Sequence, residues 1–69
     1  MPAVTVNGKL VSLPDGATVL DVVAASGASG DGRGVAVALD GQVVPRGEWA
    51  STLLGEGREI EVLHAVQGG

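Results

Sequence analysis

Cysteine is absent from this 69-residue sequence, and its absence excludes several kinds of chemistry. Without a thiol, the chain has neither a disulfide to stabilise a small fold nor a thiolate nucleophile, and it cannot relay sulfur on a cysteine of its own. His64 is the only histidine, which is too few for a metal site with the usual ligand count. A domain of this size must therefore be stabilised by the packing of its apolar side chains.

Aromatic residues are also nearly absent, because the chain has no Phe and no Tyr, and Trp49 is its only aromatic residue. Hydrophobic residues still make up 45% of the sequence, so the core has to be built from aliphatic side chains. The length allows one domain with a small core, since such a chain buries only about 60% of its unfolded surface. We expect Trp49 to cover that core, with contact to a partner protein as the alternative.

Basic residues are scarce, with four Lys and Arg against eight Asp and Glu and a net charge of −4. Nucleic-acid-binding proteins need a basic stripe, which this sequence lacks. No apolar run approaches the roughly 18 residues of a membrane span, and the N-terminus lacks the charged and apolar segments of a secretory signal. We therefore expect a cytoplasmic protein with no nucleic-acid or membrane partner, whose acidity suits a basic protein surface.

The first segment predicts a β-hairpin. Asn7-Gly8 separates two alternating runs, and this dipeptide favours a turn that needs positive φ at both central residues. The turn pairs Val4 with Val11 and leaves Leu10 on the outward face. Four aliphatic side chains then share the core face: Val4, Val6, Val11 and Leu13.

A helix should follow. Thr18 and Asp21 form a T-x-x-D capping box in front of an apolar run, which predicts a helix from Val19 to about Ser26. Gly27 is the expected C-terminal cap. The stripe expected to be buried is Val19, Val22 and Val23.

The second half predicts another hairpin and a final strand. Strands over residues 35–39 and 42–44 flank Asp40-Gly41, and a connector with an irregular or 3₁₀ turn follows. The last strand, residues 58–65, alternates so that Ile60 and Val62 share one face and Leu63 lies on the other. This order predicts an α+β fold, with a mixed sheet of about five strands and one main helix on one face.

Side chains with reactive groups are isolated in this pattern. His64 lies near the end of the last strand without an acid or nucleophile beside it, so a structural role is favoured over contact with a partner's site. Arg46 is either a partner contact or an ordinary surface cation. The glycine-rich loop over residues 28–34 lacks the motif of a phosphate-binding loop and is interpreted as a connector.

The sequence finishes on Gln67-Gly68-Gly69, directly after the last expected strand. Glycine loses the most backbone entropy on ordering and contributes no packing, so a glycine pair adds little to a fold. It suits a segment that threads a narrow slot in a partner and presents a terminal carboxylate there. The alternative is a frayed terminus with no function.

Several segments together carry a resemblance to a known family. In order they are Val6-Asn7-Gly8, LPDGATV over 13–19, GVAVAL over 34–39, VVPR over 43–46, Glu48-Trp49 and AVQGG over 65–69. With these pieces in this order, the whole chain resembles the ThiS family, the sulfur carrier proteins of thiamine biosynthesis. The glycine-rich loop and Gly47, where a polar residue is common, depart from the family pattern. The resemblance implies a β-grasp, ubiquitin-like domain over residues 1–65 with the last strand inserted centrally, and a flexible tail over 66–69.

The same resemblance implies a carrier that partner enzymes act on, with no catalytic residue, metal or bound cofactor of its own. An E1-like adenylating enzyme would use ATP to activate the Gly69 carboxylate. A persulfide enzyme would then supply sulfur, leaving a thiocarboxylate (1-thioglycine) at Gly69 that thiazole synthase receives. Val66, Gln67 and Gly68 would thread the partner's site. Three outward residues, Leu10, Leu63 and Arg46, are the candidate partner surface.

Other functions stay open at this point. A carrier could feed molybdopterin, cysteine or natural-product synthesis, although molybdopterin carriers usually have aromatic residues that are missing here. A ubiquitin-like modifier attached to lysines, or a plain interaction module, would have the same composition.

Overall fold

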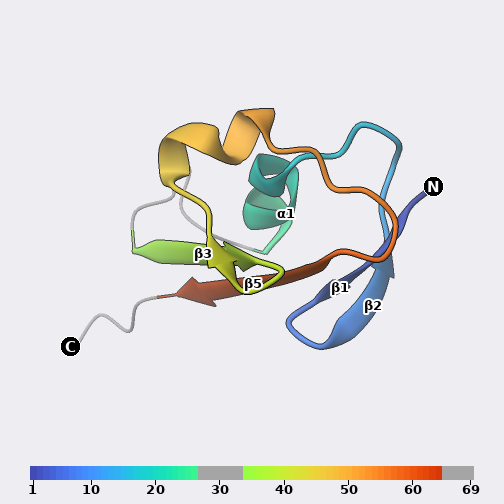
Figure 1. The fold of residues 1–69 in the computed structure, drawn as a ribbon, viewed down its shortest axis with the longest axis horizontal. Helices are drawn as coiled ribbons and strands as arrows, with labels where there is room; N and C mark the ends of the chain where they lie inside the picture. The colour runs from blue at the N-terminus through green and yellow to red at the C-terminus, as the bar shows by residue number, and fades with distance from the viewer. Residues whose placement is uncertain (27–33, 65–69) are drawn as a thin grey trace.

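A computed structural model describes residues 1–26 and 34–64 of the chain. A sheet and a helix on one of its faces make up this part, together with a 3₁₀ helix that closes the same side (Figure 1). The elements are β1 (Ala3–Val6), β2 (Lys9–Ser12), α1 (Val19–Ala25), β3 (Val35–Leu39), β4 (Gln42–Val43), η1 (Arg46–Ser51) and β5 (Glu59–His64).

The sheet has the order β2-β1-β5-β3-β4, so the last strand lies at its centre. β5 runs parallel to β1 and antiparallel to β3, while β1–β2 and β3–β4 are antiparallel hairpins. One helix on one face of a mixed five-stranded sheet is the α+β, β-grasp arrangement that the resemblance implied. The prediction of the fold is confirmed.

Both hairpins turn where the dipeptides predicted. Asn7 and Gly8 have φ values of 50° and 83°, and Asp40 and Gly41 have 49° and 84°. Asn and Asp tolerate this left-handed region better than other residues with a Cβ, and glycine enters it without strain. The first turn pairs Val4 with Val11, as expected from its two-residue length.

Helix α1 begins on the predicted capping box. The Asp21 amide donates to the Thr18 hydroxyl at 3.3 Å, and the Thr18 amide donates to the Asp21 carboxylate at 2.9 Å. Two first-turn donors thus gain partners. The helix ends at Ala25 rather than Ser26, because Ser26 is the C-cap and its hydroxyl donates to the Val23 carbonyl at 2.6 Å. The predicted cap at Gly27 lies outside the described residues.

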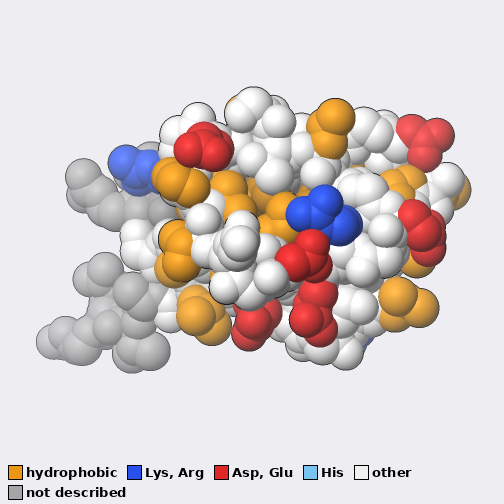
Figure 2. Space-filling view, viewed as in Figure 1, with side chains coloured by type: hydrophobic (Ala, Val, Ile, Leu, Met, Phe, Trp, Pro, Cys, Tyr) orange, Lys and Arg blue, Asp and Glu red, His pale blue; other side chains and the backbone are white. Residues whose placement is uncertain are grey.

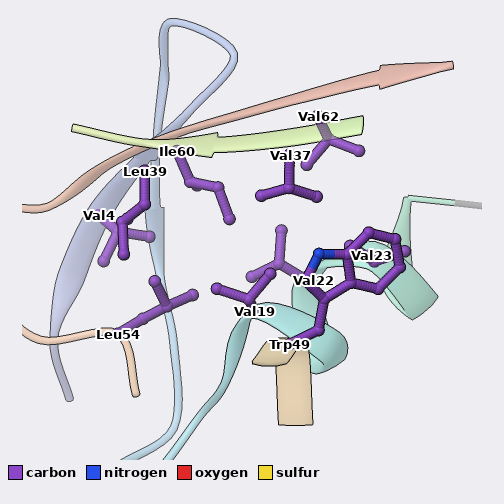
Figure 3. Packing of buried hydrophobic residues seen from close by; sticks show 10 residues of the cluster. All are labelled: Val4, Val19, Val22, Val23, Val37, Leu39, Trp49, Leu54, Ile60 and Val62. Atoms are coloured by element: carbon purple, nitrogen blue, oxygen red, sulfur yellow. The ribbon is translucent and has the colours of Figure 1, made fainter. Parts of the chain in front are cut away.

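The core lies between the sheet and the two helices (Figure 3). Trp49 is only 2% exposed and donates its indole N–H to the Val44 carbonyl at 2.9 Å, so it forms part of the core itself. An indole can be buried at low cost when its N–H has a partner. The buried cluster comprises Val4, Val19, Val22, Val23, Val37, Leu39, Trp49, Leu54, Ile60 and Val62.

Two strand boundaries differ from the prediction. β4 stops at Val43, one residue before the expected end, because Pro45 follows and has no N–H for the ladder. Val44 still donates to the Val37 carbonyl at 2.8 Å. β5 begins at Glu59, since Arg58 directly follows the turn residue Gly57, whose φ is 81°. The expected end at Ala65, and with it the boundary between domain and tail, lies outside the described residues.

Candidate functional site

β5 leads directly into the segment that carries the predicted carrier site. Val66, Gln67, Gly68 and Gly69 lie outside the described residues, so the structure defines the platform in front of them. That platform is the end of β5 with the strands and side chains around it. Because β5 lies at the centre of the sheet, its position is set from both sides.

The two neighbours hold β5 over different lengths. β3 pairs with it from Leu39–Ile60 through to Val35–His64. The parallel partner β1 pairs only with Glu59 and Ile60. The end of β5 that leads to residues 65–69 is therefore flanked by a strand on the β3 side alone.

Side chains from both hairpin turns add contacts to β5. The Asn7 side chain accepts from the Val62 amide at 2.8 Å and donates to the Val62 carbonyl at 3.1 Å. On the other side of the strand, an Asp40 carboxylate oxygen accepts from the Glu59 amide at 2.9 Å. This hydrogen bond, with the neighbouring Arg58 guanidinium, lowers the pKa of Asp40 below its ordinary value. The predicted turn residues thus also bind the central strand.

The sheet face opposite α1 carries an apolar patch near the end of β5. Leu63, which is 63% exposed, pairs with Ala36. One pair further along, Ala38 lies between Glu61 on β5 and Val43 on β4, and Val43 is 79% exposed. Directly paired residues share a face, so these side chains are neighbours. We name the group of Ala36, Ala38, Val43 and Leu63 the outer patch.

Sequence reasoning missed Val43, although the signal was present. A two-residue turn at Asp40-Gly41 fixes Val43 opposite Ala38. Ala38 alternates with Val37 and Leu39, which face the core, so Val43 had to face outward.

Leu10 faces outward as predicted and is 73% exposed, but it lies at the other end of β5. Leu10 pairs with Thr5, and Thr5 pairs with Glu59, the first residue of the strand. Leu63 is four residues further along, about 13 Å in the strand direction, and two strands away. The structure therefore does not bring Leu10 and Leu63 together.

The other two candidate side chains also lie at separate places. Arg46 is exposed at the start of η1, immediately after the edge strand β4, with β3 between that edge and β5. His64 is exposed at the end of β5, where its Nε2 lies 3.4 Å from the Ser26 hydroxyl at the end of α1. This contact joins helix and strand, in line with a structural role for His64.

Charge and composition limit the chemistry of the described surface. Acidic and hydrophobic side chains are interspersed on the face seen in Figure 2. Within residues 1–26 and 34–64, no three His, Asp or Glu side chains gather where a metal ion would bind. No helix in that part of the chain has the length and apolar character needed to cross a membrane.

Comparison with known proteins agrees with this architecture. The ThiS family model matches residues 4–69. The crystal structure of a thiamine biosynthesis protein (ThiS) from Geobacter metallireducens is 28% identical, has a TM-score of 0.75, and covers 97% of this chain and 99% of its own. The solution structure of a thiamine biosynthesis protein from the same organism is 28% identical, with a TM-score of 0.79 and coverages of 97% and 87%.

No curated protein matches the chain significantly. The family match nevertheless spans the sheet, the helices and the final glycines, and the solved structures share the fold over nearly the whole length. The chain belongs to the ThiS family.

Proposed function

We propose that this chain is the sulfur carrier of thiamine biosynthesis and that it carries sulfur as a thiocarboxylate on Gly69. The observation that supports this most directly is the family match through residue 69, which includes Gln67-Gly68-Gly69. The fold fits the role, because its central strand ends at His64, immediately before the carrying segment.

The chemistry belongs to partner enzymes. An E1-like enzyme adenylates the Gly69 carboxylate with ATP and releases pyrophosphate, since a carboxylate is a poor acyl donor until its oxygen becomes a leaving group. The terminal sulfur of an enzyme persulfide then displaces AMP. A thiol cleaves the resulting acyl disulfide and leaves the thiocarboxylate, which thiazole synthase receives. ATP is thus a cosubstrate of the activating enzyme, and this chain acts as a carrier.

The outer patch is the docking surface in this proposal. It exposes Val43 and Leu63 beside the end of β5, so a partner bound there has the carrying segment within reach. Glu59 and Glu61 point to the same face and add negative charge. A partner with apolar side chains surrounded by basic residues is complementary to this surface. Val66, Gln67 and Gly68 would then enter the partner's active site as an extended segment.

Intact mass spectrometry tests the proposal. The full chain is incubated with the E1-like enzyme of its own organism, ATP and a persulfide donor. We expect a mass increase equal to the replacement of one oxygen by sulfur, and the thiocarboxylate should react with a thiol-selective alkylating reagent although the chain has no cysteine. Omission of ATP is the control. An unchanged mass with an enzyme that charges its own carrier would contradict the proposal.

A further inference from the structure

Asn7 lies where the main-chain pairing between β1 and β5 stops. The Thr5 amide donates to the Arg58 carbonyl and the Asn7 amide to the Ile60 carbonyl, each at 2.9 Å. A parallel ladder that continued would next join Val62 to the Asn7 carbonyl and to an amide two residues further along. The chain instead turns away at Asn7, where φ is 50°.

The Asn7 carboxamide takes the place of that missing main-chain rung. Its Oδ1 accepts from the Val62 amide at 2.8 Å, and its Nδ2 donates to the Val62 carbonyl at 3.1 Å. A primary amide offers the same acceptor and donor groups as a peptide bond, so one side chain supplies both partners. The pairing of β5 on the β1 side is thereby extended to Val62.

Val62 depends on these two bonds because its main-chain groups face away from β3. The Asp40 amide donates to the Glu59 carbonyl at 2.7 Å across the β3 side. Hydrogen-bonded and non-hydrogen-bonded pairs alternate along an antiparallel ladder, so Val62 and Val37 form a pair of the second kind. The Val62 side chain is only 3% exposed, and buried main-chain groups without partners are costly.

Only two described residues of β5, Leu63 and His64, follow Val62. Both pair with β3, while Asn7 provides the last contact on the β1 side among the described residues. We infer that Asn7 is a positioning residue of the carrier: its double bond to Val62 fixes the direction in which β5 leaves the sheet, and hence where partner enzymes meet Gly69. This inference rests on the proposed function.

The variant Asn7→Gly removes the carboxamide and keeps the positive φ without strain. Asp40→Gly is a matched control, because Asp40 occupies the same position of the other hairpin turn and its side chain bonds the beginning of β5 instead. ATP–pyrophosphate exchange is measured against carrier concentration with the E1-like enzyme of the same organism, at a temperature where melting curves show each variant folded. We expect Asn7→Gly to reduce kcat/KM roughly tenfold, mainly through KM, and Asp40→Gly to leave it within about twofold.

Amide hydrogen exchange gives a readout that needs no enzyme. In Asn7→Gly, the amides of Val62, Leu63 and His64 should exchange faster, while that of Ile60 keeps its protection. Unchanged exchange at these amides, or equal losses of kcat/KM in the two glycine variants, would overturn the inference. A parent chain that supports no adenylation while Asn7→Gly still loosens these three amides would refute the proposed function and leave the positioning of β5 standing.

Asn7→Asp carries the test if the glycine variant does not fold at the assay temperature. Its carboxylate still accepts from the Val62 amide but cannot donate to the Val62 carbonyl, whereas the protonated acid can do both. The folded state therefore favours the acid and raises the pKa of the new carboxyl group. Protection of Leu63 and His64 should return as pH falls through that pKa, and protection that is independent of pH would contradict the inference.

Discussion

At the residue scale, the two hairpin turns use the same backbone geometry for two different purposes. Asn7 and Asp40 both have φ near 50°, and both direct their side chains at β5 from opposite sides. The neutral carboxamide of Asn7 offers a donor and an acceptor and replaces a rung of the ladder. The carboxylate of Asp40 only accepts, and it combines the Glu59 amide with the Arg58 guanidinium. The choice between Asn and Asp thus matches the groups that each turn faces.

Gly68 carries the first prediction at this scale. Gly68→Val adds a β-branched side chain, which restricts the backbone and fills space in a narrow partner slot. We expect the variant to melt like the parent, within about 0.5 kcal/mol of unfolding free energy, because terminal substitutions rarely affect stability. It should nevertheless fail in ATP–pyrophosphate exchange with the activating enzyme.

Gly55→Val is the control for this substitution. A Cβ at Gly55 meets no atom within 4 Å, and the residue lies in the segment before β5, away from the end of that strand. It should retain exchange activity. Parental exchange by Gly68→Val would refute the narrow slot, and a large fall in its melting temperature would mean that the tail is a packed element.

At the element scale, β3, β4 and β5 together form the outer patch, and Leu63 tests its role. Leu63→Asp places a charge on an exposed position of the face opposite α1. We expect affinity for the activating enzyme to fall about tenfold or more, as for an apolar interface residue that is buried on binding. Titration calorimetry or surface plasmon resonance measures this loss. The melting temperature should change little, since the side chain is mostly exposed in the free protein.

Leu10→Asp is the matched comparison. Leu10 is an exposed leucine on the same sheet face, but it lies beside the beginning of β5. This variant should bind like the parent. An equal loss of affinity in both variants would extend the docking surface across the sheet to β2, and unchanged binding by Leu63→Asp would remove the outer patch from the model.

Elements with strong local signals could be predicted from the sequence. The two turn dipeptides, the capping box at Thr18 and the alternation in the last strand rest on neighbours within a few residues. The parallel pairing of β1 with β5 joins Thr5 to Glu59, and no local pattern specifies such a contact. Its prediction came from family resemblance. The bond from Asn7 to Val62 escaped prediction for the same reason, because it joins residues 55 positions apart.

At the scale of the whole molecule, growth separates the thiamine pathway from other uses of a sulfur carrier. The host with this gene deleted should require thiamine or its thiazole precursor, and either supplement alone should restore growth. Expression of the parent chain should remove the requirement, whereas Gly68→Val should not. A deletion strain that needs cysteine or a molybdopterin product instead would assign the sulfur to another pathway.

The central place of β5 also bears on synthesis of the protein. β1 and β3 have no common neighbour until β5 enters between them, and β5 is the last strand to leave the ribosome. Non-local pairing of this kind forms late, because the connecting chain must be closed first. A translation product that stops before residue 59 would keep two open strand edges and lack Ile60 and Val62 of the core. Folding is therefore post-translational, and proteolysis should clear truncated carriers that could occupy the activating enzyme without accepting sulfur.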